Sequence, residues 1–102
     1  MDSLKLGDDA AAAVSKTPNR VTLDSMIAKI DGEEYIQPDL MPHLTICVVK
    51  LKNGFSLVGK SAPADPENFD AELGRKFARE DAIRQMWPLE GYALRERMAE
   101  EG

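Results

Sequence analysis

The residues best suited to chemistry in this chain are cationic and polar, and they gather around one junction. Arg75 and Arg79 are four residues apart in a helical pattern, so their guanidinium groups project from the same side of the expected helix. Two guanidinium groups can bind a phosphate or carboxylate through paired hydrogen bonds. Asn68 marks the expected N-terminus of that helix, whose free backbone donors suit an anion. The predicted ligand-binding residues are Tyr35, Lys60, Ser61, Asn68, Arg75, Lys76, Arg79 and Trp87.

The same residues also fit an ordinary solvated helix surface. Carboxylates alternate with the cations, and Glu72 and Glu80 are spaced to form ion pairs with them. Tyr35 is open to two interpretations as well, because it could anchor its own loop or offer its ring to a ligand. The sequence leaves both alternatives open.

Catalytic and metal-binding patterns are missing from the sequence. His43 is the only histidine, and no Cys/His/Asp cluster with metal-ligand spacing surrounds it. There is no phosphate-binding loop, no dinucleotide-binding glycine pattern and no nucleophile elbow. We therefore expect a protein that is not an enzyme and that uses neither a metal nor a cofactor.

Composition limits the class of partner. The net charge of −5 argues against general nucleic-acid binding, which depends on Lys and Arg neutralising phosphates. The single cysteine, Cys47, excludes an intrachain disulfide and fits a reducing cytoplasm. No segment has the roughly 18 consecutive apolar residues of a membrane span, and the N-terminus has no signal-peptide layout. We expect a soluble, cytoplasmic protein without a membrane partner.

One stretch organises the expected fold. Residues 67–92 show apolar residues at three- and four-residue steps, which predicts a long amphipathic helix with Asn68 as its N-cap. Pro88 predicts a kink, and a last helix follows over residues 89–98. Gly74 costs about 1 kcal/mol relative to alanine in a helix interior, so we expect another group to pack closely against it.

The N-terminal part predicts less structure. Residues 1–19 are rich in Asp, Ala and Ser, and we expect a flexible leader. Residues 21–30 predict a short helix, with Thr22 as its N-cap and Gly32 placed to end it. A loop over residues 33–42 follows. The sequence therefore predicts a flexible leader at residues 1–19 and a single domain of the α+β class at residues 20–102.

A two-stranded antiparallel hairpin is the clearest local signal. Two β-branched runs flank Asn53-Gly54, the dipeptide favoured in a two-residue type I′ turn. That turn length pairs Lys50 with Leu57 and Val48 with Gly59. One face then carries Leu44, Ile46, Val48, Phe55 and Leu57, and the other carries Cys47, Val49, Leu51 and Val58.

Both faces of this hairpin are apolar, and an isolated hairpin is marginally stable. Since the helices cannot easily cover both faces, we expect a homo-oligomer, a dimer or higher. The predicted oligomer interface is Cys47, Val49, Leu51 and Val58. A tightly packed monomer is the alternative.

Several short motifs point to a known family. The specific ones are Lys52-Asn53-Gly54-Phe55, Pro66-Glu67-Asn68-Phe69-Asp70, Gly74-Arg75-Lys76 with Ala78-Arg79, and Trp87-Pro88-Leu89 with Gly91-Tyr92. With these motifs the chain resembles, over about residues 20–98, a family of small tailed-phage and prophage proteins of the N4 and Sf6 phage type. The resemblance implies an accessory protein that acts in the cytoplasm of a bacterial host cell by binding.

Two functions follow from this resemblance and from the residues. In the first, the protein captures an anionic, nucleotide-like ligand of host defence. Arg75, Arg79, Lys76 and Lys60 would hold phosphate, and Tyr35, Phe55 or Trp87 would stack on a base. In the second, it is an acidic inhibitor or adaptor whose carboxylates and apolar hairpin face bind a host or phage protein.

Overall fold

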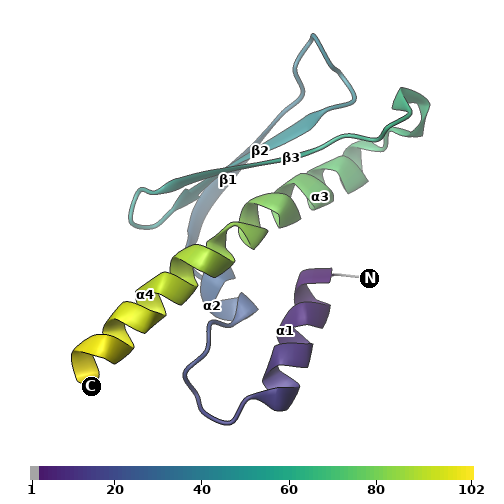
Figure 1. Ribbon diagram of the computed structural model, residues 1–102. Helices are drawn as coiled ribbons and strands as arrows, with labels where there is room; N and C mark the ends of the chain where they lie inside the picture. The colour runs from purple at the N-terminus through teal and green to yellow at the C-terminus, as the bar shows by residue number, and fades with distance from the viewer. Residues whose placement is uncertain (1–2) are drawn as a thin grey trace.

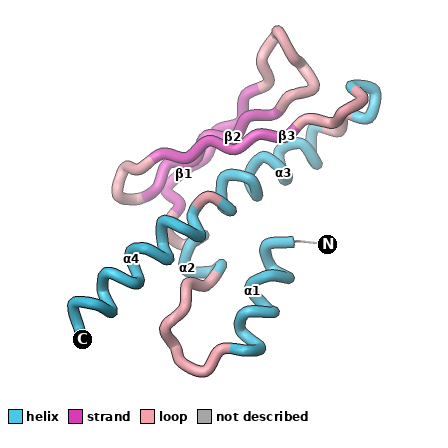
Figure 2. The backbone as a smooth tube through the Cα atoms, in the orientation of Figure 1, coloured by secondary structure: helices cyan, strands magenta, loops and turns pink. Residues whose placement is uncertain are grey.

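The computed structural model describes residues 3–102 as a helical layer packed on one face of an antiparallel sheet (Figure 1). The elements are α1 Ser3–Val14, α2 Leu23–Ile27, β1 Ile30–Ile36, β2 Thr45–Leu51, β3 Ser56–Ser61, a 3₁₀ helix Pro66–Asn68, α3 Ala71–Arg84 and α4 Met86–Glu101. The strand order is β1-β2-β3 (Figure 2). The predicted α+β class is confirmed, but the sheet has three strands instead of two.

The additional strand is β1, and the predictions of a helix that reaches Ile30 and a loop over residues 33–42 are wrong for this segment. Residues 31–34, four of its seven, are Asp, Gly and Glu and are exposed, so the segment lacks the apolar alternation of a typical strand. It pairs antiparallel with β2, for example through Tyr35 and Cys47. Thr22 does cap α2, as predicted, because its hydroxyl accepts a hydrogen bond from the Ser25 backbone N–H at 3.1 Å.

The β2–β3 hairpin has a three-residue turn at residues 52–54. The Leu51 backbone N–H donates to the Phe55 carbonyl at 2.8 Å, and Gly54 alone has a positive φ, of 90°. A type I′ turn would need positive φ at Asn53 as well. Instead the Asn53 side chain accepts a hydrogen bond from the Phe55 N–H at 2.9 Å. The predicted two-residue turn is therefore wrong.

This longer turn shifts the register by one residue. Val48 pairs with Val58, and Val49 pairs with Leu57. Because side chains alternate along a strand, the shift moves every β3 side chain to the opposite face from the one predicted. Leu57 is thus buried under α3, whereas Val58 lies on the other face.

The shift also divides the predicted oligomer interface. Cys47 and Val49 are completely buried and Leu51 is 6% exposed, all within the core that the helices cover. Val58 is 55% exposed on the opposite face. The prediction that these four residues share one exposed face is wrong, because three of them belong to the core of the chain.

The long C-terminal helix begins and breaks at different residues from those predicted. Asp70 is the N-cap of α3, since its carboxylate accepts from the Leu73 N–H at 2.9 Å, and Asn68 instead ends the 3₁₀ helix. The break falls at Gln85, three residues before Pro88. Pro88 is then the third residue of α4, where its missing N–H costs little, while its ring disfavours a helix that continues from Arg84.

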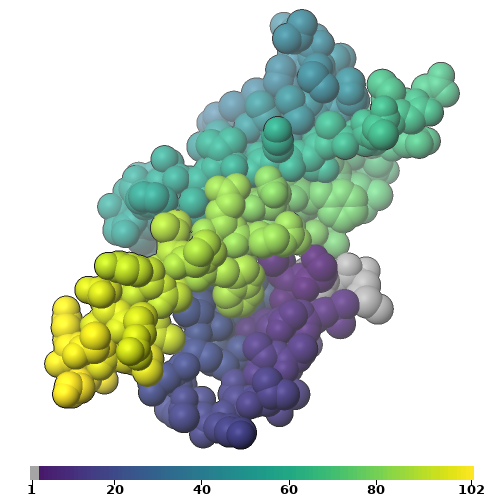
Figure 3. All heavy atoms as spheres, viewed as in Figure 1, coloured from purple at the N-terminus to yellow at the C-terminus, as the bar shows by residue number. Residues whose placement is uncertain are grey.

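Part of the predicted flexible leader is helical. Leu4 of α1 is 5% exposed, and the Asp8 carboxylate accepts from the Arg20 guanidinium at 3.1 Å and the Leu23 N–H at 3.2 Å. Figure 3 shows α1 in purple against the helical layer. Met1 and Asp2, also in the predicted leader, lie outside the described residues. Across residues 3–102, no helix is long and apolar enough to cross a membrane.

Candidate ligand-binding site

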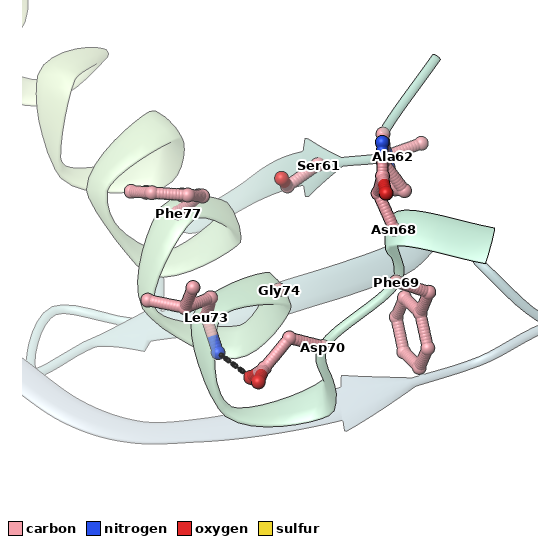
Figure 4. Close-up of a pocket in the computed structure, with 9 residues that line it drawn as sticks. Ser61, Ala62, Asn68, Phe69, Asp70, Leu73, Gly74 and Phe77 are labelled. Atoms are coloured by element: carbon pink, nitrogen blue, oxygen red, sulfur yellow. Dashed lines mark hydrogen bonds between the residues drawn. The ribbon is translucent and has the colours of Figure 1, made fainter. Parts of the chain in front are cut away.

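A pocket lies where β3 ends and α3 begins (Figure 4). Its volume is about 230 Å³, and it is lined by Ser61, Ala62, Pro63, Asn68, Phe69, Asp70, Leu73, Gly74 and Phe77. Figure 4 places the rings of Phe69 and Phe77 at opposite ends of it. Phe77 and Leu73 are about half exposed, so the pocket is open to solvent. It therefore offers apolar walls with a few polar groups at the rim, which is typical of small-molecule sites.

Two carboxylates shape the segment that carries Asn68 and Phe69. Asp65 accepts a hydrogen bond from the Glu67 N–H at 3.0 Å, which starts the 3₁₀ helix, and Asp70 caps α3. The carboxylate of Asp70 therefore occupies the helix N-terminus that was expected to bind an anion. The prediction that Asn68 marks that terminus is wrong, although Asn68 does line the pocket together with Ser61.

Gly74 forms the floor of this region through close packing, as predicted. A Cβ atom on Gly74 would lie 2.6 Å from the Thr45 hydroxyl oxygen and 3.4 Å from the Phe69 ring. The Thr45 hydroxyl is fully buried and makes no hydrogen bond with any described residue. Absence of a side chain at Gly74 thus lets α3 approach β2 and leaves room for Phe69.

Lys76 does not line the pocket, but its side chain lies beside Phe77, which does. Its ammonium lies 5.5 Å from the centre of the Phe77 ring, which is cation–π distance. Its ion pair with Glu80 is long, at 3.7 Å.

Lys60, in contrast, is exposed on the sheet face opposite α3, because neighbouring side chains in a strand alternate and Ser61 lies on the helix side.

A second polar group lies on the other side of α3, against β1. The Arg79 Nε donates to one carboxylate oxygen of Glu33 at 2.8 Å, and the Tyr35 hydroxyl donates to the other at 3.0 Å. Arg75, one turn earlier, makes no hydrogen bond or ion pair with any residue among 3–102. Arg79 thus pairs with a carboxylate, as the solvated-surface alternative requires, but the carboxylate comes from β1 instead of α3.

Burial governs the ionisation of the groups next to Glu33. Loss of solvent, reinforced by the Glu33 carboxylate, raises the pKa of Tyr35 above its ordinary value. Burial, again with Glu33, raises the pKa of the Cys47 thiol. Tyr35 therefore remains a neutral hydrogen-bond donor, and Cys47 does not have the lowered pKa of a reactive thiol.

Trp87 lies apart from both groups. With Ser3, Leu4, Gly7, Ala11 and Arg84, it lines a separate hollow of about 440 Å³ between α1 and the start of α4. The predicted binding residues therefore divide among the pocket, the Glu33 side of α3, the open sheet face and the α1 hollow. Among residues 3–102 there is no group of three or more His, Cys, Asp or Glu residues that could hold a metal.

The pocket residues absent from the predicted binding set include Phe69, Leu73 and Phe77, which the helical pattern places on one apolar face. Leu73 and Phe77 do lie on one side of α3, and Phe69 precedes the helix, but Gly74, Ala78 and Ala82 are the residues that pack on the sheet. The sequence signal that could have found them is a row of small residues, Gly74, Ala78 and Ala82, beside the large side chains of Leu73 and Phe77 on the same helix. It indicates a helix that approaches the sheet through the small side chains and leaves the large ones at its flank.

Comparison with known proteins agrees with the resemblance noted in the sequence. A family model matches residues 21–98, which include β1 to β3, α3 and every residue that lines the pocket. Searches of the curated proteins and of the solved structures found no match to the chain. By this match the chain belongs to the phage protein (N4 Gp49/phage Sf6 gene 66) family.

Proposed function

We propose that this phage-family protein is a non-enzymatic binding protein that captures a small ligand with a planar ring and an anionic group, such as a nucleotide. The observation that carries the proposal is the pocket at the start of α3. It combines the Phe69 and Phe77 rings with the polar side chains of Ser61 and Asn68. The Lys76 ammonium lies outside this lining, 5.5 Å from the centre of the Phe77 ring.

Each part of the pocket suits one part of such a ligand. Stacking of a nucleobase on an aromatic side chain is worth about 1–3 kcal/mol per base. The Asn68 amide and the Ser61 hydroxyl can donate to and accept from the edge of a base. The Lys76 ammonium can hold a phosphate, because its competing pair with Glu80 is long at 3.7 Å.

Arg75 and Arg79 have a secondary part in this proposal. Arg79 would have to exchange Glu33 for the ligand, whereas Arg75 has no partner to give up among the described residues. We therefore assign the phosphate to Lys76, and we expect Arg75 to contribute through its longer-range field. Removal of a nucleotide signal of host defence in the cytoplasm of the bacterial host would be the biological role.

Nucleotide titration by calorimetry tests the proposal, with adenine and guanine mono-, di- and cyclic nucleotides as probes. We expect Phe77→Ala and Lys76→Ala each to weaken binding about tenfold, in line with the loss of one stacking or charged contact. Arg75→Ala, the matched control on the neighbouring residue, should weaken it less than about threefold. Absence of binding by the whole panel, or equal binding by folded Phe77→Ala, would contradict the proposal.

A second candidate function, binding to another protein, is favoured by the outer edge of β1. The backbone groups of Glu33 and Tyr35 point away from β2, since antiparallel pairs alternate between hydrogen-bonded and non-bonded positions. These groups have no partner among the described residues. Exposed Glu34 gives the edge a negative charge without an ion-pair partner among residues 3–102, whereas Asp31 pairs with Lys50 and Glu33 with Arg79. An extended basic segment could add to this edge as a strand.

A basic peptide distinguishes the two functions. If this edge is the functional surface, Glu33→Lys with Glu34→Lys abolishes binding of a Lys-rich extended peptide, while Phe77→Ala and Lys76→Ala leave it unchanged. If the pocket is the functional site, nucleotide binding shows the opposite pattern.

A further inference from the structure

A polar group without a partner lies beneath the pocket at the start of α3. Thr45 is 1% exposed, and its hydroxyl oxygen makes no hydrogen bond with any residue among 3–102. Buried hydroxyl groups are nearly always hydrogen-bonded, because an unpaired one keeps the full cost of leaving water. The Thr45 hydroxyl therefore has a hydrogen-bonding capacity that the free protein does not use.

Thr45 borders the pocket from the sheet side. It pairs with Ser61 across β2 and β3, so both side chains lie on the face that α3 covers, and Ser61 lines the pocket. A Cβ atom on Gly74 would lie 2.6 Å from the Thr45 hydroxyl oxygen and 3.4 Å from the Phe69 ring. Gly74 and Phe69 also line the pocket, whereas Thr45 does not. The hydroxyl thus lies directly behind two residues of the pocket wall.

Phe69 is the part of this wall that can move. Gly74 is held within α3, where its N–H donates to the Asp70 carbonyl at 2.8 Å. Phe69 lies between the 3₁₀ helix and Asp70, and its backbone is extended, with φ −65° and ψ 131°. Its side chain is partly exposed, so the ring can rotate toward solvent without breaking a backbone hydrogen bond.

We propose that the Phe69 ring covers the Thr45 hydroxyl in the free protein and turns away when a nucleotide binds, and that this hydroxyl then selects the base. The inference rests on the proposed function, because the ligand is the nucleotide assigned to this pocket. One edge of the base takes the place of the Phe69 ring over Gly74 and forms the hydrogen bond that Thr45 lacks. Turned outward, the ring remains beside the pocket and can stack on the base.

The chemistry of a hydroxyl defines the preferred class of base. A threonine hydroxyl both donates and accepts, so it pairs with an exocyclic amine or with an exocyclic carbonyl. It gains nothing from a C–H group at the same position, because the hydroxyl then stays unpaired. Thr45 therefore favours bases that carry an amino or carbonyl group on the bound edge over bases that carry neither.

Protein stability tests the cover without any ligand. Thr45→Val keeps the branched shape of the side chain and removes the unpaired hydroxyl, so it should raise the midpoint of urea unfolding by about 0.5 M. In a Phe69→Ala background water reaches the hydroxyl, and Thr45→Val should then bring no rise. An equal rise in both backgrounds, or no rise in either, would overturn the inference. Circular dichroism checks that each variant is folded.

Nucleotide titration by calorimetry tests the selection and needs variants of Thr45 only. The probes are AMP, IMP and the monophosphate of unsubstituted purine riboside, which has C–H where the other two carry an amine or a carbonyl. Wild type should bind AMP and IMP about tenfold more tightly than the third probe. Thr45→Ser, which keeps the hydroxyl, should retain this preference. Thr45→Val should bind all three probes alike, at the level of the weakest.

The results separate this inference from the proposed function. Absence of binding by all three probes would overturn both. Binding by wild type with the same preference in Thr45→Val would leave the nucleotide pocket in place and overturn the role of Thr45 alone. Loss of the preference in Thr45→Val, together with its retention in Thr45→Ser, would support the role, because a residue that acts only in packing changes the affinity for all three probes equally.

Discussion

The Glu33 carboxylate binds two side chains, Arg79 of α3 and Tyr35 of its own strand β1. One of its carboxylate oxygens accepts from Arg79 of α3 and the other from Tyr35 of β1, which also lies beside Cys47 in the register. The Glu33 carboxylate positions both Arg79 and Tyr35, and 31% of the Glu33 side chain is exposed. Because the pair is partly screened by water, its main effect is on the ionisation of Tyr35 and on the position of Arg79.

Tyr35 should make the protein sensitive to alkaline pH. Burial and Glu33 raise the pKa of Tyr35 above its ordinary value of 10.0, so the unfolded chain loses the phenolic proton at a lower pH than the folded chain. This contribution to stability is complete below about pH 10 and is lost as the pH rises through the raised value, at no more than about 1.4 kcal/mol per pH unit.

Urea unfolding at about pH 8 and about pH 11 measures this effect. Wild type should lose more of its free energy of unfolding between the two values than Tyr35→Phe, which has no phenol to ionise. Cys47 also has a raised pKa and interacts with Tyr35, so both proteins carry Cys47→Ala and no thiol titrates in either of them. Equal losses in the two proteins would show that Tyr35 does not carry the effect.

At the scale of elements, α3 packs on the sheet through glycine and alanine. A Cβ atom on Gly59 would lie 2.1 Å from the Ala78 carbonyl oxygen and 2.5 Å from the Ala82 backbone nitrogen. These are backbone atoms, so they cannot move aside without displacing the helix.

At the outer edge of β3, the Asp81 carboxylate accepts a hydrogen bond from the Lys60 N–H at 2.9 Å, and the Gln85 amide donates one to the Val58 carbonyl at 2.8 Å. These side chains occupy outward backbone groups of β3, which blocks strand addition there.

Gly59→Ala should therefore lower the free energy of unfolding by about 3 kcal/mol, because a methyl group forces α3 away from β3. The matched control is Gly91→Ala in α4, where a Cβ atom meets nothing within 4 Å. That substitution should raise stability by up to about 1 kcal/mol, since alanine favours the helix. Chemical denaturation measures both, and a Gly59→Ala protein as stable as wild type would contradict the packing.

At the scale of the whole molecule, the protein is elongated. Its radius of gyration is 15.9 Å and its extents are 53 × 30 × 18 Å, whereas a compact chain of this length has a radius of gyration of about 13 Å. Figure 1 shows the cause, because α4 continues the direction of α3 past the sheet. Met86 is the one residue of α4 that is buried. Helix α1 lies beneath the junction and joins the rest through Leu4, Asp8 and Ser3.

Leu4 should decide whether α1 stays docked. Leu4→Ala removes the one buried side chain of α1 and should cost roughly 2–3 kcal/mol of docking free energy. Amide hydrogen exchange should then become much faster in α1, while β2 and α3 keep their protection. Leu6→Ala is the control, because Leu6 is 50% exposed and its loss should leave α1 exchange nearly unchanged. Equal exchange in the two variants would show that Leu4 does not hold the helix.

Local signals predicted the elements that have strong patterns of their own. Thr22 as a cap, the β2–β3 hairpin, the long helical segment and the close packing at Gly74 all follow from short-range rules, and the structure confirms them. β1 could not be predicted in this way, because its pairing with β2 supplies the hydrogen bonds that its polar sequence does not announce. The pocket could not be predicted for a related reason. The apolar side chains of Leu73 and Phe77 fit a core as well as a pocket, and only the position of the sheet distinguishes the two.

The amino-acid sequence by itself determined the α+β class, the family, and the pairing of two strands, because these depend on residue types and on spacings of a few positions. Tertiary structure alone decided which face of the sheet is buried, because α3 packs closely there, at Gly74 against Thr45 and at Ala78 against Gly59. It also decided how the cations separate, with Lys76 beside the Phe77 ring and Arg79 bound to Glu33. Such choices arise from contacts between segments far apart in the chain, where no local spacing rule applies.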